Sequence, residues 1–283
     1  MTVLDALSDR FADLIAESCD RGRILHDLPS PGISSVADAY AVQDRIFARM
    51  TKPGAVAAGW FASATNASMR VQLGLEEPYA ARWRPGRIVE APVEPLSVGP
   101  LGLGLELEVC FELAADLPPR SAPYGEPEVL AAVAAVRPGI EMVVSCFADW
   151  MTQKPLNLVA EGGPEQLLVI GPAVTRWSSL PLDALPVTLT VDGQEAAVGS
   201  SGQVMAGPAS VLVWLANHAA RRGEGLRRGQ VCNTGMCAPV FFASPGQRVQ
   251  ADFGPLGRVD LDLAAESGAP TRTAEPANME EDR

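Results

Sequence analysis

Residues 101–113 read LGLGLELEVCFEL, and apolar residues occupy every odd position. The even positions carry Gly, Glu or Cys. Because successive side chains of a strand point to opposite faces, this period of two predicts a β-strand with one apolar face. Glu106 and Glu108 share the other face, with α-carbons expected roughly 6.5–7 Å apart. Both carboxylates could therefore converge on one ion, although a solvated outer face explains the same segment.

Shorter apolar runs on both sides of this segment, bounded by Gly and Pro, are also typical of strands. They cover residues 55–64, 86–94, 139–147, 166–174, 185–200 and 248–264. Helical spacing of apolar residues is found over 3–18, over 37–50, near 128–136 and near 208–223. Helices at the front followed by many strands predict an α+β fold, with a mixed β-roll core and an N-terminal helical segment.

Changes of composition divide the chain into three parts. Residues 1–55 hold the N-terminal helices and include the breaker Lys52-Pro53-Gly54. Residues 56–265 form the main domain, which is long enough to bury a sizeable core. Residues 266–283 contain almost no large apolar side chain, and this tail is expected to be disordered.

The overall charge excludes some classes of protein. The chain has 34 acidic and 22 basic residues, a formal net charge of -12. No basic patch is available to neutralise phosphates, which argues against nucleic acid. No run of roughly eighteen apolar residues exists, so a membrane-spanning segment is not expected. The acidic N-terminal stretch does not resemble a signal peptide, and a cytoplasmic protein is expected.

Cysteine and histidine narrow the chemistry. The 5 cysteines are scattered without a CxxC spacing, which is typical of reduced structural thiols. His26 and His218 are the only histidines, so a His-rich metal site is excluded. Neither histidine follows a recognisable nucleophile motif, and a serine or cysteine hydrolase is therefore disfavoured.

Glu141 adds a third carboxylate to the argument. It lies in the mostly apolar run GIEMVVSCF at 139–147, where an unpaired charge would be costly to bury. Three carboxylates together would suit a hard cation such as Mg²⁺ or Mn²⁺, which prefers oxygen ligands. An arginine-paired glutamate at a strand end explains Glu141 equally well.

Several motifs spread over about four fifths of the chain resemble the 2-keto-4-pentenoate hydratase branch of the fumarylacetoacetate hydrolase superfamily. Each piece is weak by itself, and their order and spacing carry the likeness. The pieces are DAYAVQ at 38–43, ELE at 106–108, IE at 140–141, ADW at 148–150, GPASVLVWLAN at 207–217, NTG at 233–235 and PGQRVQADFGPLGRV at 245–259.

The resemblance implies a fumarylacetoacetate hydrolase-like catalytic domain over 56–265, with Glu106, Glu108 and Glu141 as ligands of Mg²⁺ or Mn²⁺. It implies a small 2-oxo acid or related enolisable carboxylate as substrate, held to the ion by its carboxylate and keto oxygens. The implied reaction is of the lyase type, meaning hydration, decarboxylation or C–C cleavage, with the ion as Lewis acid. Members commonly assemble into homo-oligomers, and the same is expected here.

The chain departs from this family where the family keeps its proton-transfer groups. The family lysine of G-[YW]-K-[IV]-G corresponds to Phe61, and the acid that often follows the next proline corresponds to Tyr79. The A-D-N segment reads AEG at 160–162, which retains an acid at Glu161. The D-S-R segment reads VSC at 144–146.

Three interpretations of these losses stay open. The family reaction could run with substitutes, with Glu161 as the base and Lys154 supplying a cation. A different metal-assisted step on a larger or less polar substrate could use Phe61 and Tyr79 as pocket walls, which fits recruitment to a specialised biosynthetic pathway. The chain could also be a non-catalytic ligand-binding or assembly protein on the same fold.

Further substrate-binding candidates come from the same regions. Ser63 and Thr65 in ASATNAS could hold a substrate carboxylate, although such clusters also satisfy turns. Gln43 on the second helix could point into the cleft or pack between helices. Gly235 is expected to adopt a backbone conformation that glycine reaches most cheaply.

Overall fold

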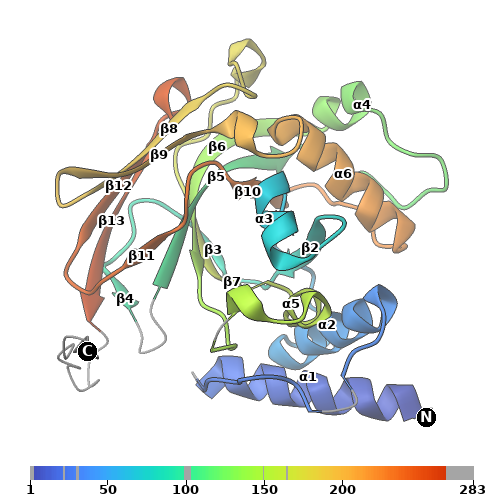
Figure 1. The fold of residues 1–283 in the computed structure, drawn as a ribbon. Coiled ribbons are helices and arrows are strands. Elements are labelled where there is room, and N and C mark those ends of the chain that lie inside the picture. Colours follow the sequence, from blue (N-terminus) through green and yellow to red (C-terminus); the bar gives the residue numbers. More distant parts are fainter. Residues whose placement is uncertain are drawn as a thin grey trace, which may run out of the picture.

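A computed structural model describes residues 3–21, 23–29, 32–98, 103–148, 150–163 and 165–265. Within these ranges the chain folds into two packed sheets with helices around them (Figure 1). The expected α+β fold with a curled sheet and a helical N-terminus is confirmed. The tail 266–283, expected to be disordered, lies outside the described residues.

The larger sheet carries the glutamates singled out above. Its strands in spatial order are β2 (Tyr79–Trp83), β1 (Gly59–Ser63), β10 (Val231–Met236), β5 (Leu103–Leu113), β6 (Val133–Val143), β7 (Glu165–Ile170) and β3 (Ile88–Glu90), and β11 (Phe241–Ala243) also pairs with β5. Strand β5 runs antiparallel to both β6 and β10. In this register Glu106 lies directly opposite Glu141.

The smaller sheet closes the apolar side of the larger one. Its order is β4 (Leu96–Val98), β13 (Arg258–Ala265), β12 (Arg248–Asp252), β8 (Pro186–Val191) and β9 (Gln194–Ser200). Leu105, Leu107 and Val109 of β5 join Leu189 and Val249 of this sheet in the main core. The apolar face predicted from the alternation in β5 is therefore the core face, because removing these apolar side chains from water stabilises the fold.

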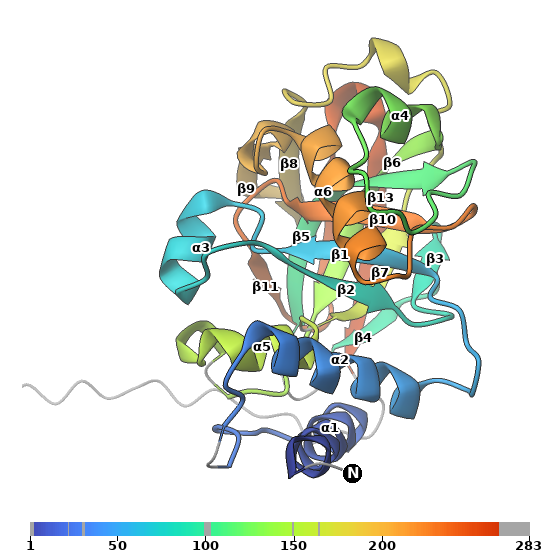
Figure 2. The same cartoon turned by 90° about the vertical axis from the view of Figure 1, so that its right-hand side faces the viewer.

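The helices lie on two sides of the sheets (Figures 1 and 2). They are α1 (Val3–Arg21), α2 (Val36–Met50), α3 (Ala67–Leu73), α4 (Glu126–Ala131), α5 (Pro155–Glu161) and α6 (Pro208–Arg221), with single 3₁₀ turns at Trp150–Thr152, Trp177–Ser179, Ser201–Gln203 and Gly254–Leu256. Helices α1, α2 and α5 share a separate apolar cluster that includes Phe11, Ile15 and Leu158. No described helix is long and apolar enough to cross a membrane.

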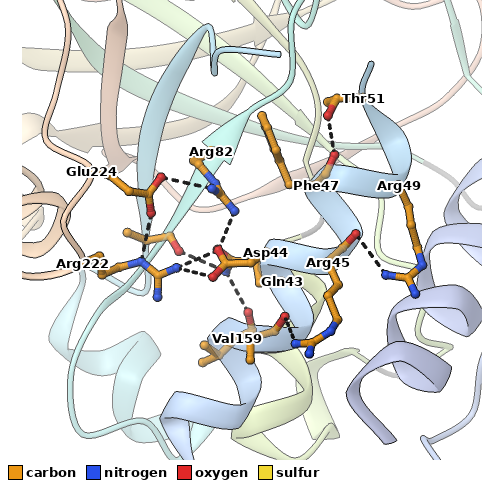
Figure 3. Close-up of polar contacts among 12 residues, drawn as sticks. Gln43, Asp44, Arg45, Phe47, Arg49, Thr51, Arg82, Val159, Arg222 and Glu224 are labelled. Carbon is orange, nitrogen blue, oxygen red and sulfur yellow. Dashed lines mark hydrogen bonds and ion pairs between the residues drawn. The ribbon is translucent and has the colours of Figure 1, made fainter. Parts of the chain in front are cut away.

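Helix α2 is joined to the larger sheet by charged contacts (Figure 3). Asp44 accepts hydrogen bonds from Arg82 of β2 at 2.6 Å and from Arg222 after α6 at 2.7 Å. Glu224 contacts the same two arginines. The Arg82 guanidinium also lies 4.5 Å from the ring centre of Phe47. These contacts hold the N-terminal helices against the sheet that carries the glutamates.

One expected helix is shorter than its sequence pattern indicates. The helix expected near 128–136 ends at Ala131, and Val133–Val143 forms β6 instead. Alanine-rich sequence favours a helix locally, but pairing with β5 and burial of Val136 outweigh that preference. Helices α3 and α5 were not expected, because each is only 7 residues long and shows little periodicity.

Candidate functional site

Three carboxylates meet on the face of the larger sheet that points away from the main core. Glu106, Glu108 and Glu141 each offer an oxygen atom, and these atoms lie within 4.8 Å of one another. Side-chain alternation aims Glu106 and Glu108 the same way, and the β5–β6 register brings Glu141 beside them. Glu108 and Glu141 are only 1% and 3% exposed, so the solvated outer face considered for this segment is not what the fold forms.

Asn233 and Gly235 of β10 hold two of these carboxylates in position. The Asn233 Nδ2 donates to Glu108 Oε2 at 2.9 Å and to Glu141 Oε2 at 2.7 Å. The Gly235 N–H donates to Glu108 Oε2 at 2.6 Å. Trp83 Nε1 donates to Asn233 Oδ1 at 2.6 Å, which fixes the orientation of the amide. These donors are neutral, so they orient the acids without cancelling their charge.

Gly235 takes the backbone conformation that was expected of it. Its φ is 94°, and a β-carbon at this position would lie 1.9 Å from Thr65 Oγ1. Any side chain here would therefore strain the backbone and displace Thr65. The glycine allows β10 to bring its N–H against Glu108.

The electrostatics of the three acids fit a cation. Burial, followed by repulsion from Glu108, raises the pKa of Glu106 to about 8. Burial also raises the pKa of Glu108, against the lowering effect of its hydrogen bonds. Crowding acids in a poorly solvated place disfavours their charged forms, and a divalent ion would reverse that effect. An all-oxygen donor set suits Mg²⁺ or Mn²⁺ rather than a thiophilic metal.

A cavity of about 570 Å³, open mouth included, extends from this cluster towards α3 and α5. It is lined by Ser63, Ala64, Thr65, Asn66, Met69, Leu73, Tyr79, Glu106, Ser145, Trp150, Leu158, Glu161, Gly235 and Met236. Of the three acids, Glu106 is the one that lines this space.

Glu161 is a buried acid on the wall of the same cavity. It ends α5, and its carboxylate accepts hydrogen bonds from Ser145 Oγ at 2.9 Å and from the Cys146 N–H at 2.7 Å. Burial nevertheless raises the pKa of Glu161. Because burial disfavours the charged form, Glu161 holds a proton more readily than an exposed glutamate does, which suits it to act as a general acid or base.

Tyr79 lines the cavity together with Glu106 and Glu161. It lies opposite Ser63 in the β1–β2 register and forms a hydrogen bond with it. Burial raises the pKa of Tyr79, and the nearby Glu161 and Glu106 add to that effect. The phenol therefore keeps its proton at neutral pH and remains a hydrogen-bond donor at the cavity wall.

Three residues proposed from the sequence lie outside both the cavity lining and the carboxylate cluster. Phe61 is 1% exposed and packs against Trp83, with ring centres 5.1 Å apart. Gln43 donates its amide hydrogens to the backbone oxygens of Val159 at 2.9 Å and Ala80 at 3.1 Å (Figure 3).

Lys154 is the third of these residues. It is largely exposed and forms an ion pair with Asp27 at 2.8 Å. The sequence motifs thus bring Ser63, Thr65, Tyr79, Glu106 and Glu161 to one cavity. The fold places Phe61 in an apolar cluster, Gln43 between α2, β2 and α5, and Lys154 at the surface.

Asn233 is the residue whose part in the site sequence reasoning missed. Its NTG motif was visible at 233–235, but only the glycine had a local interpretation. An asparagine in an apolar strand is a detectable signal, because a buried amide needs partners. Which partners it finds depends on strand pairing, which the motif does not reveal.

An α+β fold with a curled sheet, and an all-carboxylate cluster at the end of a cavity, define a candidate divalent-metal protein of the β-roll class. Residues 78–263 match the family described as fumarylacetoacetate (FAA) hydrolase C-terminal. The chain belongs to this family.

Relatives of known name narrow the branch. The chain is 29% identical over 226 residues to 2-keto-4-pentenoate hydratase of Paraburkholderia xenovorans, covering 80% of this chain and 82% of the relative. It is 25% identical over 259 residues to a 4-oxalocrotonate decarboxylase of Pseudomonas, covering 91% and 98%. The resemblance to the hydratase branch is confirmed, and the expected lyase-type enzyme agrees with these names.

A solved structure shares the fold over nearly the whole chain. It is 4-oxalocrotonate decarboxylase of Pseudomonas putida G7, complexed with magnesium and adipate. The TM-score is 0.82 at 22% identity, over 93% of this chain and 99% of the other. The N-terminal helices are therefore included in the shared fold.

Proposed function

We propose that this protein is a divalent-metal-dependent lyase acting on a small 2-oxo acid or a related enolisable carboxylate. The observation that carries the proposal is one cavity with a three-carboxylate cluster and, on its wall, an acid of raised pKa. The hydratase and decarboxylase names of its relatives support the same reaction class. Decarboxylation, hydration and C–C cleavage all begin from an enolisable 2-oxo acid.

Glu106, Glu108 and Glu141 would hold Mg²⁺ or Mn²⁺, and the magnesium complex of the structural neighbour favours the first. When bound, the ion supplies Lewis acidity towards the two oxygens of a 2-oxo carboxylate. Asn233 keeps Glu108 and Glu141 aimed at a common point by donating to both. Ser63 and Thr65 line the cavity, and the Thr65 hydroxyl donates to the Thr234 carbonyl at 3.0 Å, so Ser63 is the one of the two that can donate a hydrogen bond to a substrate carboxylate.

Glu161 would move the proton that the reaction requires. Its carboxylate is held by Ser145 and Cys146, so it reaches the cavity in a fixed orientation. Tyr79, as a neutral phenol beside it, would donate a hydrogen bond to the substrate without giving up its proton. We assign no catalytic task to Lys154, because its ion pair with Asp27 holds it at the surface.

The pocket differs chemically from that of the family pattern. Phe61 replaces the family lysine and contributes to an apolar cluster with Trp83, which removes a cation from this region. The cavity wall also includes the apolar residues Met69, Leu73 and Leu158. These features support a less polar substrate than the relatives use, and with it a place in a specialised biosynthetic pathway.

The test combines metal binding with turnover. Protein stripped with a chelator is titrated calorimetrically with Mg²⁺ and Mn²⁺, and the Glu106→Ala/Glu108→Ala variant is titrated alongside. We expect binding by the wild type and none by the double variant. The wild type should then convert 2-keto-4-pentenoate, 4-oxalocrotonate or a less polar 2-oxo acid only when the metal is restored.

Glu161→Gln separates metal binding from proton transfer. It keeps the shape of the side chain and removes its acid–base function, so metal affinity should stay while turnover falls by about 10²–10⁴-fold. Metal binding without turnover of any 2-oxo acid would support the non-catalytic interpretation. Absence of metal binding in both the free and substrate-containing wild type would overturn the proposal.

A further inference from the structure

A second group of metal-ligand side chains lies behind the cavity wall. Cys19, Cys146 and Glu161 each offer a ligand atom, and these atoms lie within 4.8 Å of one another. The group draws on the end of α1, the loop after β6 and the end of α5. Glu161 lines the cavity, whereas neither cysteine belongs to the lining.

Backbone hydrogen bonds hold the two cysteine-bearing segments together. The Leu25 N–H donates to the Cys146 carbonyl at 2.7 Å, and the Ala148 N–H donates to the Leu25 carbonyl at 2.8 Å. Leu25 and Phe147 form a parallel bridge between these bonds. The Arg23 N–H donates to the Ser18 carbonyl and closes the end of α1 beside Cys19. The proximity of the thiols therefore follows from paired backbone.

The two thiols are already in contact with each other and with the carboxylate. A hydrogen bond with Cys19, and then burial, raises the pKa of Cys146. The Glu161 carboxylate forms hydrogen bonds with both the thiol and the backbone N–H of Cys146. Cys146 is 1% exposed, whereas Cys19 is open to solvent. An ion arriving from solvent would thus reach Cys19 first.

This donor set differs in kind from the carboxylate cluster. Two thiolates and one carboxylate suit a borderline-soft ion, while three carboxylates suit a hard one. Around a tetrahedral Zn²⁺ ion, ligand atoms lie about 3.3–3.8 Å apart. Small side-chain rotations would bring the present spacing to that range and leave one position for water. The remaining cysteines, Cys110, Cys232 and Cys237, are buried elsewhere.

We propose that Cys19, Cys146 and Glu161 form a Zn²⁺ site, and that its occupation withdraws Glu161 from the cavity chemistry. The two thiols release their protons to solvent as the ion binds, and no electron is transferred. The site itself is independent of the proposed function, and only its inhibitory consequence rests on the role of Glu161 there. The same ion would tie α1 to the loop after β6.

The test uses Cd²⁺ as the probe, because thiolate ligands to cadmium give an ultraviolet charge-transfer band that carboxylates do not. The full chain is titrated in its reduced form. We expect a two-thiolate band in the wild type that saturates at one thiolate-bound Cd²⁺ per chain and is competed away by Zn²⁺. Cys19→Ser should lose about half of the band and bind about a hundredfold more weakly. Cys19 is exposed, so this variant should fold.

Two variants separate this site from the carboxylate cluster. Glu106→Ala/Glu108→Ala should keep the band, since it removes only the hard-cation ligands, and Cys232→Ser should keep it as a thiol control. An unchanged band in Cys19→Ser, or no band in the wild type, would overturn the proposal. A band in a protein that turns over no 2-oxo acid would leave the Zn²⁺ site standing and remove the proposed function instead.

Discussion

Acidic side chains at the two ends of one face of β5 have different hydrogen-bond partners. Near one end of β5, Glu112 is paired with Arg137 of β6 at 2.8 Å, and Arg137 also donates to Gly171 O at 2.9 Å. Near the other end, Glu108 and Glu141 are held by the Asn233 amide and, for Glu108, by the Gly235 N–H. Acids that serve the fold are neutralised by arginine, whereas the acids of the cavity receive neutral donors that leave their charge for a ligand.

The contacts of α2 repeat the first arrangement. Asp44 and Glu224 are shared between Arg82 and Arg222, and the group joins three distant segments (Figure 3). Opposite charges in partly buried positions compensate one another within the protein. In the carboxylate cluster, burial raises the pKa of Glu106 and of Glu108, and repulsion from Glu108 adds to the rise for Glu106.

The largest difference between the two ends of β5 should appear in metal affinity. Glu141→Gln removes one ligand charge but keeps the side-chain shape, so divalent-ion binding should weaken by about 10²–10³-fold. Glu112→Gln is the matched change at the arginine-paired end and should leave metal affinity within about threefold. Calorimetry with Mg²⁺ on both variants checks this, and equal losses would mean that the two ends do not differ in function.

Asn233 tests whether neutral donors position the cluster. Asn233→Leu removes the amide that donates to Glu108 and Glu141, so metal affinity should fall about 10–100-fold. Asn217→Ala is the control, because Asn217 also bonds through its amide but to the Tyr124 backbone. It should change thermal stability without changing metal affinity. Equal metal affinities in the two variants would contradict the positioning role.

Arg137 tests the opposite expectation at the other end. Arg137→Met keeps much of the stem but leaves Glu112 and the Gly171 carbonyl without their guanidinium partner. We expect a loss of about 1–2 kcal/mol in the free energy of unfolding, discounted for the partial exposure of Glu112. Denaturant melts measure the loss, while metal titration of the folded variant should match the wild type. A strong loss of metal affinity would show that Arg137 serves the site.

His218, beside the arginines that contact α2, should contribute no pH-dependent change of stability at neutral pH, and its effect should be seen only as the pH falls. Its ring stacks on Trp214 and lies 5.1 Å from Tyr40, and burial, followed by Arg222 and Arg221, lowers its pKa to about 4. A lowered folded-state pKa means that the unfolded chain binds more protons between about pH 6.5 and 4. The stability that His218 contributes is therefore complete above pH 6.5 and lost as pH falls towards 4.

His218→Phe should flatten this dependence. The slope that one proton adds is at most about 1.4 kcal/mol per pH unit, so urea melts at several pH values between 4 and 7 are needed. Phe keeps the ring contacts with Trp214 and Tyr40 and cannot bind a proton. Curves of identical slope for the wild type and the variant would show that His218 is not the titrating group.

Local pattern in the sequence was sufficient for the elements that have strong periodicity. The alternation of 101–113 predicted β5 and the shared face of Glu106 and Glu108, and helical spacing predicted α1 and α2. Family motifs then indicated Glu141 as a partner. The same local reasoning extended the helix to residue 136, because the helical preference of an alanine-rich stretch does not reveal that its second half pairs with β5.

Tertiary structure decided everything that depends on which distant segments meet. The β5–β6 register placed Glu141 opposite Glu106, and β10 brought Asn233 between the acids. The loop after β6 set Cys146 against Glu161 and beside Cys19, a group that no sequence spacing indicates. Side-chain direction along one element follows from backbone geometry and can be read locally. Contacts between elements follow from packing, where the burial of whole faces selects one register among many.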